Sequence, residues 1–230
     1  MKKVVVLSGA GISMESGIPT FRDANGLWEG HRIEEVASPE GWKADPVRVL
    51  EFYNQRRKKA LEVKPNRAHF VVAELEQHFN VVVVTQNVDD LHERAGSTHV
   101  IHLHGSLFES RSTCDETLVY PIEGWELESG DKCEKGSQLR PNIVWFGEMV
   151  PLMEVAAYEA STADFFIVVG TSMVVYPAAG LIDYTPHDCV KFLVDPKVPD
   201  LAHIGNVVVF EEKASTGMEK VFAELMKIEK

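Results

Sequence analysis

VVVLSGAGIS, residues 4–13, joins a short apolar run to a glycine turn. A continuous apolar run of this length predicts a strand that is buried on both faces of a parallel sheet. Gly9, Ala10 and Gly11 then follow the carboxyl end of that strand, where glycines allow the backbone to approach the pyrophosphate of a dinucleotide. Met14 stands in place of the usual third glycine, so this stretch alone is equally consistent with an ordinary tight turn.

Similar apolar runs recur along the chain, and helical patterns lie between them. The two clearest helices are expected at residues 68–79 and 216–228, the second with Thr216 and Glu219 at capping-box spacing. Alternating strands and helices predict an α/β fold with a Rossmann-like, doubly wound parallel sheet. The expected strands are residues 3–7, 81–85, 100–103, 165–169, 190–194 and 207–210.

Two segments interrupt this alternation. Residues 27–64 are rich in charge and in helix formers, and residues 110–140 contain three glycines, many acidic residues and two of the cysteines. Both are interpreted as insertions that together form a smaller second lobe. Residues 1–230 are therefore expected to form a single domain, in which a Rossmann-like core carries these two insertions.

The composition limits the function classes to be considered. The chain has 230 residues, of which 45% are hydrophobic and 25% charged, as in a globular protein with a sizeable core. The net charge of −12 argues against nucleic acid as a direct partner. No apolar run approaches the ~20 residues of a membrane helix, so no membrane partner is expected. The three cysteines are too few for a disulfide framework, which favours the cytoplasm.

Polar residues follow several of the predicted strands at their carboxyl ends, where ligands of doubly wound sheets bind. Amide and carboxylate groups there could bond ribose hydroxyls and a nicotinamide, and small hydroxyl-bearing turns suit phosphate. Each cluster also has a plain interpretation, because Asn and Asp commonly begin turns and cap helices. The candidates are Gln86, Asn87, Asp89, Gly170, Thr171, Ser172 and Asp195.

His104 follows the predicted strand at residues 100–103, at the same edge of the sheet. Because an imidazole titrates near neutral pH, it suits a general base. A single histidine at a strand end is more often a surface or capping residue, so its position alone favours that simpler interpretation.

Five motifs in one order along nearly the whole chain resemble the sirtuins, the NAD-dependent protein lysine deacylases. They are GAGISMESGIPTFR at residues 9–22, TQNVD at 85–89, HGS at 104–106, FGE at 146–148 followed by Pro151, and GTS at 170–172. The motifs are long and specific, so chance similarity is not a credible explanation.

The resemblance implies NAD as cofactor and a set of residues that bind it. It implies that Asn87 and Asp89 position the nicotinamide end and that His104 is the general base for a ribose hydroxyl. Asp195 departs from the asparagine that is frequent at its position in the family. The implied NAD contacts are Gly9, Ala10, Gly11, Phe21, Arg22, Gln86, Asn87, Asp89, Gly170, Thr171, Ser172, Asp195 and Ala214.

The reaction implied by the resemblance transfers an acyl group from lysine to ADP-ribose. The acyl oxygen attacks C1′ of the nicotinamide ribose, and the products are nicotinamide, O-acyl-ADP-ribose and free lysine. The expected partners are acylated-lysine proteins, and the chain is expected to act as a monomer. Two alternatives stay open: a non-catalytic NAD or ADP-ribose binding module, and a protein ADP-ribosyltransferase.

Tyr53 and Arg56 are three residues apart and share one face if this segment is helical. A phenol and a guanidinium can clamp a carboxylate, and the pair is similar to the signature of class III sirtuins, whose substrates include succinyl-lysine and malonyl-lysine. Ala24 matches the small residue that widens the acyl pocket of that class. A solvated basic helix face at residues 56–59 is the simpler alternative.

The substrate backbone is expected at residues 146–148, by the same resemblance. Phe146, Gly147 and Glu148 would receive the peptide, and Val144 would line the channel for the lysine methylenes. Sirtuins commonly hold a structural zinc with two Cys-x-x-Cys pairs. Only Cys114 and Cys133 remain of those four ligands, so no metal site and no structural zinc are expected.

Overall fold

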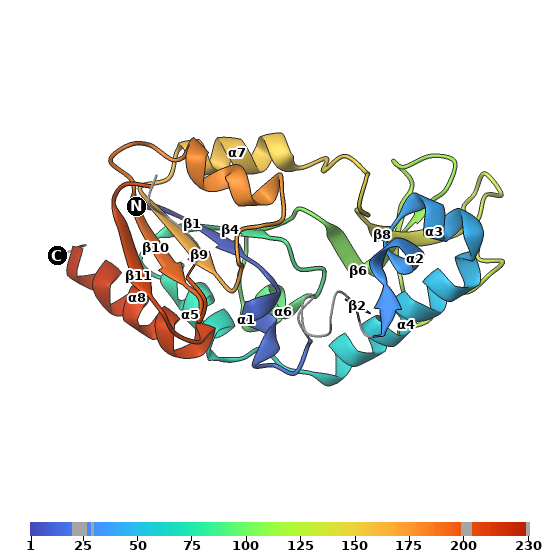
Figure 1. Ribbon diagram of the computed structural model, residues 1–230, viewed down its shortest axis with the longest axis horizontal. Helices are drawn as coiled ribbons and strands as arrows, with labels where there is room; N and C mark the ends of the chain where they lie inside the picture. The colour runs from blue at the N-terminus through green and yellow to red at the C-terminus, as the bar shows by residue number, and fades with distance from the viewer. Residues whose placement is uncertain (20–26, 29, 199–203, 229–230) are drawn as a thin grey trace.

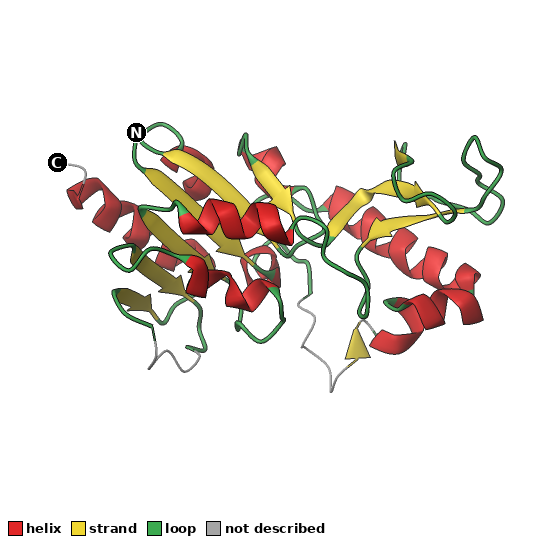
Figure 2. Cartoon of the chain, turned by 90° about the horizontal axis from the view of Figure 1, so that it is seen from above, coloured by secondary structure: helices red, strands yellow, loops and turns green. Residues whose placement is uncertain are grey.

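The computed structural model describes residues 1–19, 27–28, 30–198 and 204–228. The chain forms two lobes (Figures 1 and 2). The larger lobe is built on a six-stranded parallel sheet, and the smaller one combines helices with a three-stranded antiparallel sheet. The predicted α/β class with a second lobe is therefore confirmed.

The six-stranded sheet has the order β11-β10-β9-β1-β4-β5, and every neighbouring pair is parallel. From β1 the chain first builds outward through β4 and β5, then returns to the other side of β1 with β9. This reversal places a topological switch point between β1 and β9, where doubly wound sheets bind ligands. All six predicted strands are found: β1 Lys3–Ser8, β4 Asn80–Thr85, β5 Val100–His102, β9 Phe165–Val169, β10 Val190–Val194 and β11 Val207–Phe210.

Alternate residues of the central strand pack under different helices, because successive side chains of a strand point to opposite faces. Val4 and Val6 belong to a core with α5 and α8, whereas Val5 and Leu7 belong to a core with α7 and the 3-10 helix η1. Both cores are almost completely buried, which explains the continuous apolar character of β1. The helices of this lobe are α1 Ala10–Met14, α5 Arg67–Leu75, α6 Leu91–Ala95, α7 Met153–Ser161, η1 Ala178–Tyr184 and α8 Ala214–Ile228.

The predicted capping box of the last helix is wrong. Helix α8 begins at Ala214, so Thr216 lies inside its first turn and donates to the carbonyl of Lys213. The carboxylate of Glu15 instead accepts from the backbone N–H of Ser215, at 2.9 Å, and from its hydroxyl, at 2.8 Å. A side chain 200 residues away thus satisfies the helix end, which no local pattern could indicate.

The first predicted insertion packs against residues on both sides of the second one, so the second segment of the small lobe extends beyond the expected residues 110–140. Residues Phe52 and Tyr53 of the first insertion pack with Leu107, Ile143 and Trp145. The first insertion supplies β2 Leu27–Trp28, β3 His31–Arg32, α2 Ile33–Val36, α3 Pro39–Ala44 and α4 Pro46–Glu62. The longer second segment supplies the three-stranded sheet: β6 Gly105–Ser112, β7 Val119–Pro121 and β8 Leu139–Ile143.

The fully buried guanidinium of Arg57 ties this lobe together. Its Nε donates to the carbonyl of Leu107, and its Nη1 donates to Asn54 Oδ1, at 2.9 Å, and to the carbonyl of Trp125, at 2.6 Å. Asn54 in turn exchanges two hydrogen bonds with the backbone of Leu127, at 3.0 and 3.1 Å. Burial lowers the pKa of Arg57 to about 10, so the group remains protonated at neutral pH.

Arg57→Met should lower the free energy of unfolding by roughly 1–3 kcal/mol, because buried carbonyl groups lose their donors. Urea unfolding followed by fluorescence measures this change. Arg48→Met is the control on the same helix, since Arg48 is exposed and makes only surface ion pairs. Equal effects of the two substitutions would contradict the structural role of Arg57.

Candidate active site

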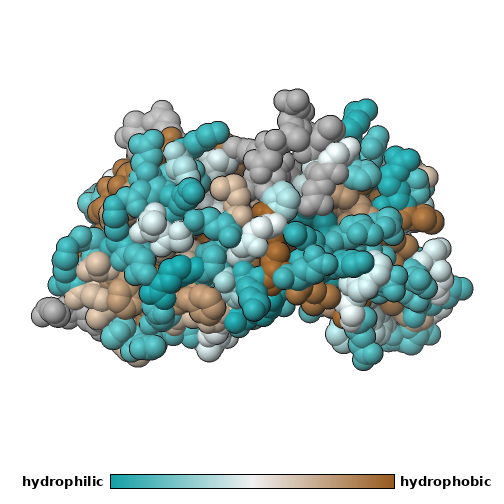
Figure 3. Space-filling model, turned by 90° about the horizontal axis from the view of Figure 1, so that it is seen from below, coloured by the Kyte–Doolittle hydropathy of each residue, from teal (hydrophilic) through white to brown (hydrophobic). Residues whose placement is uncertain are grey.

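A cavity of about 580 Å³ lies where the two lobes meet, at the carboxyl ends of β1, β4, β9 and β10. Figure 3 shows a largely hydrophilic face, with hydrophobic residues at the junction of the lobes and also toward the outer side of each lobe. Every predicted site residue that the structure describes lines this cavity. From the large lobe come Gly9, Ala10, Gly11, Gln86, Asn87, Asp89, Gly170, Thr171, Ser172, Asp195 and Ala214, and the remaining wall holds His104, Tyr53, Arg56, Val144, Phe146, Gly147 and Glu148. Phe21, Arg22 and Ala24 lie outside the described residues.

Two glycine turns cross at the floor of the cavity. Gly11 N donates to the carbonyl of Gly170, at 2.8 Å, and Gly9 N donates to the carbonyl of Val169, at 3.1 Å. A Cβ on Gly170 would lie 2.2 Å from the backbone nitrogen of Ile12, and Gly170 has a φ of +64°. Only glycine allows this approach. The floor is therefore made of backbone, which can contact the phosphates of a dinucleotide.

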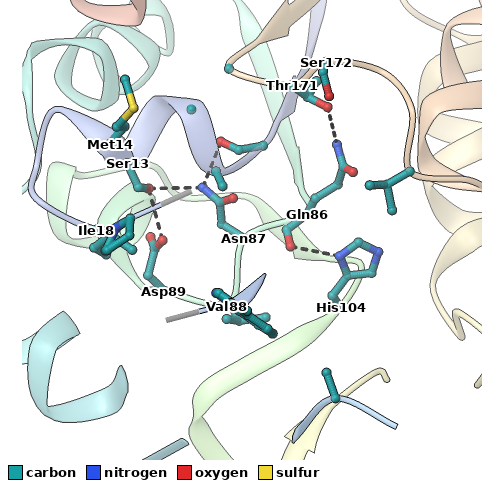
Figure 4. Close-up of a pocket in the computed structure, with 18 of the residues that line it drawn as sticks. Ser13, Met14, Ile18, Gln86, Asn87, Val88, Asp89, His104, Thr171 and Ser172 are labelled. Carbon is teal, nitrogen blue, oxygen red and sulfur yellow. Dashed lines mark hydrogen bonds between the residues drawn. The ribbon is translucent and has the colours of Figure 1, made fainter. Parts of the chain in front are cut away.

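The amide of Asn87 is held in place beside the first glycine turn, where it bonds to Ser13 (Figure 4). Its Nδ2 donates to the carbonyl of Gly9, at 3.2 Å, and to Ser13 Oγ, at 3.1 Å. The backbone N–H of Asn87 donates to Thr85 Oγ1, at 3.0 Å. The two bonds of Nδ2 fix the orientation of the amide, and the third bond holds the backbone at Asn87, so the side-chain oxygen is presented in one orientation.

Asp89 is buried beside Asn87 and accepts from Ser13 Oγ, at 3.0 Å, and from Leu91 N, at 3.2 Å. Burial raises the pKa of Asp89, and the two hydrogen bonds oppose that shift. Sequence reasoning missed Ser13, whose hydroxyl bridges Asn87 and Asp89. The available signal was its position two residues after the glycine turn.

His104 is held through its Nδ1, which lies 2.9 Å from the carbonyl oxygen of Gln86 (Figure 4). A carbonyl only accepts, so Nδ1 carries the proton and Nε2 keeps its lone pair. Burial lowers the pKa of His104, and the bond to Gln86 partly opposes this. Gln86 is itself tied to the floor, because its Nε2 donates to Thr171 Oγ1 at 3.1 Å. The imidazole is therefore a neutral base with a fixed tautomer at neutral pH.

The small lobe contributes a phenol and a guanidinium to the opposite wall. Tyr53 is fully buried, and its oxygen accepts from Trp145 Nε1 at 3.0 Å, so its own O–H is available to donate. Burial raises the pKa of Tyr53, an effect that the charge of Arg56 partly offsets. The guanidinium of Arg56 stacks over the ring of Trp28, at 4.1 Å from its centroid. Helix α4 thus directs both predicted residues to one cavity.

The carboxylate of Glu148, which was expected to receive the substrate peptide, is bound by other groups of the chain. It accepts from Arg140 Nη1 at 2.7 Å, from Arg111 Nη2 at 3.1 Å and from Trp145 N at 2.8 Å. Burial would raise its pKa, but these donors together lower it. The side chain therefore fixes the turn at residues 145–148, and it is the exposed Gly147 of that turn that offers its backbone to the cavity.

A model of the Sir2 family matches residues 9–177, which include most of this cavity wall. The chain belongs to the Sir2 family.

Curated relatives of this Sir2 chain are similar over nearly its whole length. A protein named NAD-dependent protein deacylase from Bacteroides thetaiotaomicron is 52% identical, and the alignment covers 96% of this chain and 97% of the relative. A Helicobacter pylori protein of the same name is also 52% identical, with 99% of each chain covered.

Solved structures agree with the family assignment. The complex of a Sir2 homologue with NAD has a TM-score of 0.89 at 42% identity, covering 100% of this chain and 91% of that chain. A Sir2 protein bound to acetylated peptide has a TM-score of 0.81 at 31% identity, covering 97% and 93%.

The cavity of this Sir2 chain fits NAD by the chemistry of its donors. The backbone floor at Gly11 and Gly170 suits the pyrophosphate, and Asp195 at the end of β10 places a carboxylate where a ribose diol can bind. The anchored amide of Asn87 also lines the cavity, and its side-chain oxygen can accept a hydrogen bond from a ligand. Within the described residues there is no group of three or more His, Cys, Asp or Glu that could hold a metal, and the absence of a structural zinc stays a prediction. No described helix is long and apolar enough to cross a membrane.

Gly170→Ala should abolish NAD binding, because its new Cβ would overlap the backbone at Ile12 and push the two turns apart. Isothermal titration with NAD measures the loss. Gly130→Ala is the matched control: Gly130 also has a positive φ, of +107°, but nothing lies within 4 Å of its Cβ position. It therefore carries only the ~1–2 kcal/mol cost of a left-handed alanine. Unchanged NAD affinity in Gly170→Ala would refute the role of the crossed turns.

Proposed function

We propose that this protein is an NAD-dependent protein-lysine deacylase that removes succinyl and malonyl as well as acetyl groups from lysine. The observation that carries the proposal is the meeting of two kinds of group in one cavity. A neutral His104 and an anchored Asn87 stand on the cofactor side, and Tyr53 and Arg56 stand on the small-lobe side. The names of the relatives support the deacylase activity, and the products follow as nicotinamide, O-acyl-ADP-ribose and free lysine.

When bound, NAD supplies an electrophilic C1′ on its nicotinamide ribose and nicotinamide as the leaving group. The glycine turns hold the pyrophosphate, and the amide of Asn87 orients the nicotinamide end. Because Asn87 is anchored to Gly9 and Ser13, little reorganisation is needed when the cofactor binds.

His104 moves a proton at its Nε2. This nitrogen accepts a proton from a hydroxyl group in the cavity, while Nδ1 keeps its own proton on the carbonyl of Gln86. The same carbonyl stabilises the imidazolium that forms, so His104 acts as the general base. Gln86 is a positioning residue in this step.

The carboxylate of a succinyl or malonyl group would lie against Tyr53 and Arg56. Arg56 supplies a permanent charge and planar donors, and Tyr53 supplies a phenol whose raised pKa keeps it protonated. The apolar wall formed by Val144, Trp145 and Leu107 suits the lysine methylenes and excludes water from the reacting amide.

Mass spectrometry of one peptide in succinyl-lysine and acetyl-lysine forms, with and without NAD, tests the proposal. NAD-dependent loss of the acyl group with formation of O-acyl-ADP-ribose establishes the deacylase. Transfer of ADP-ribose to the peptide would support the ADP-ribosyltransferase instead, and NAD binding without turnover would support the binding module.

Arg56→Met should reduce kcat/KM for the succinyl peptide far more than for the acetyl peptide. The loss of a charge-assisted bond is worth roughly 1.5–3 kcal/mol, which is about a 10- to 150-fold difference. Lys58→Met is the control, because Lys58 is exposed on the same helix. Equal losses for both peptides would remove Arg56 from acyl recognition.

The rate of deacylation should fall at acidic pH with a midpoint below the ordinary histidine value of 6.5. The folded pKa of His104 is lowered by burial, so the imidazole stays neutral at pH values where an exposed histidine is protonated. Profiles of kcat/KM against pH measure the midpoint, and His104→Ala should abolish turnover at every pH. A midpoint above 6.5, or wild-type turnover in the variant, would contradict this role.

We also propose that the protein acts in the cytoplasm and that its partners are proteins with acylated lysines. The three cysteines are too few for a disulfide framework, which supports a reducing compartment. The monomeric state stays a prediction, and the absence of nucleic-acid binding stays a prediction from the negative net charge.

A further inference from the structure

Two cysteines converge on one hydroxyl group in the small lobe. Ser112 Oγ lies 3.3 Å from Cys114 Sγ and 3.3 Å from Cys133 Sγ. The two sulfur atoms are therefore separated by no more than twice that distance, although they come from different segments of the chain. None of these three residues is among the described residues that line the cavity.

The backbone around the two thiols is tied together on both sides. Thr113 N donates to the carbonyl of Gln138 at 3.1 Å, and Cys133 N donates to the carbonyl of Ser137 at 2.9 Å. Lys135 Nζ pairs with the Asp115 carboxylate at 2.7 Å. Because both segments are held by these bonds, the approach of the sulfur atoms is a property of the fold, and rotation about the Cα–Cβ bonds changes their separation.

The two thiols differ in their access to solvent. Cys114 is exposed, whereas Cys133 is buried, with 6% of its surface accessible. An oxidant in solution therefore reaches Cys114 first, and Cys133 stands behind it. This is the arrangement of a thiol that reacts with the oxidant and a second thiol that resolves the sulfenic acid.

We propose that Cys114 and Cys133 are a thiol-oxidation site that forms a reversible intramolecular disulfide with a hydroperoxide. The Cys114 thiolate attacks the peroxide O–O bond, giving a sulfenic acid and releasing an alcohol, or water from hydrogen peroxide. Cys133 then attacks the Cys114 sulfur and expels water. Two thiols are oxidised and one peroxide is reduced, and a small-molecule dithiol reverses the reaction.

The disulfide would form near the ends of β6 and β8, the two strands whose arginines hold the turn at residues 145–148. Ser112 ends β6, and its neighbour Arg111 donates to Glu148. On the facing strand, Leu139 pairs with Ser112, and its neighbour Arg140 also donates to Glu148. A covalent link at this end of the two strands restricts the unfolded chain, so the oxidised protein unfolds at a higher temperature.

The test treats the reduced native protein with an equimolar amount of hydrogen peroxide, followed by alkylation and peptide mapping without reductant. We expect one cross-linked peptide pair that contains Cys114 and Cys133, a mass lower by two hydrogen atoms, and full reversal by dithiothreitol. The melting temperature should rise on oxidation in the wild type. Cys189→Ala is the control and should still form the cross-link, because Cys189 lies in the core of the large lobe.

Two single variants separate the steps. Cys133→Ser should leave a Cys114 sulfenic acid that reacts with dimedone, and Cys114→Ser should leave Cys133 alkylatable after denaturation. Recovery of Cys114 as a sulfinic acid in the wild type, with Cys133 still a thiol, would overturn the proposal. So would cross-links that join two chains or that involve Cys189.

Discussion

The hydrogen bond from Gly11 N to the carbonyl of Gly170 is the contact on which the site depends. It joins the turn after β1 to the turn after β9, across the switch point of the sheet. Neither position can carry a side chain, because a Cβ on Gly11 would meet Gly170 Cα at 2.7 Å. The close crossing leaves a floor of peptide groups on which a pyrophosphate can lie.

Polar side chains then build outward from this floor. Asn87 is fixed to the first turn through Gly9, and Gln86 is fixed to the second through Thr171. His104 in turn depends on the carbonyl of Gln86 for its tautomer. The reactive groups therefore derive their orientation from the same crossing of the two turns. A shift of either turn would change the position of Asn87 or of the His104 imidazole.

In the small lobe, buried arginine side chains hold separate segments together by hydrogen bonds. Arg57 donates hydrogen bonds to one carbonyl of β6 and to one in the loop at residue 125. Arg111 and Arg140 both donate to the carboxylate of Glu148. These charges are costly to bury, but Arg57 satisfies the backbone carbonyls of Leu107 and Trp125, and Arg140 also satisfies the carbonyl of Ile143. The lobe is thus held by hydrogen bonds as well as by its apolar core.

The sequence by itself determined the six strands, the two-lobed α/β architecture and the family, because continuous apolar runs and long motifs carry that information locally. It also placed Asn87, His104, Tyr53 and Arg56 among the candidates. Tertiary structure alone decided which side chains serve one another: Glu15 caps α8, Ser13 bridges Asn87 and Asp89, and Glu148 faces two arginines. These partners come from distant segments, and their pairing depends on how the strands are ordered in space, which no local spacing records.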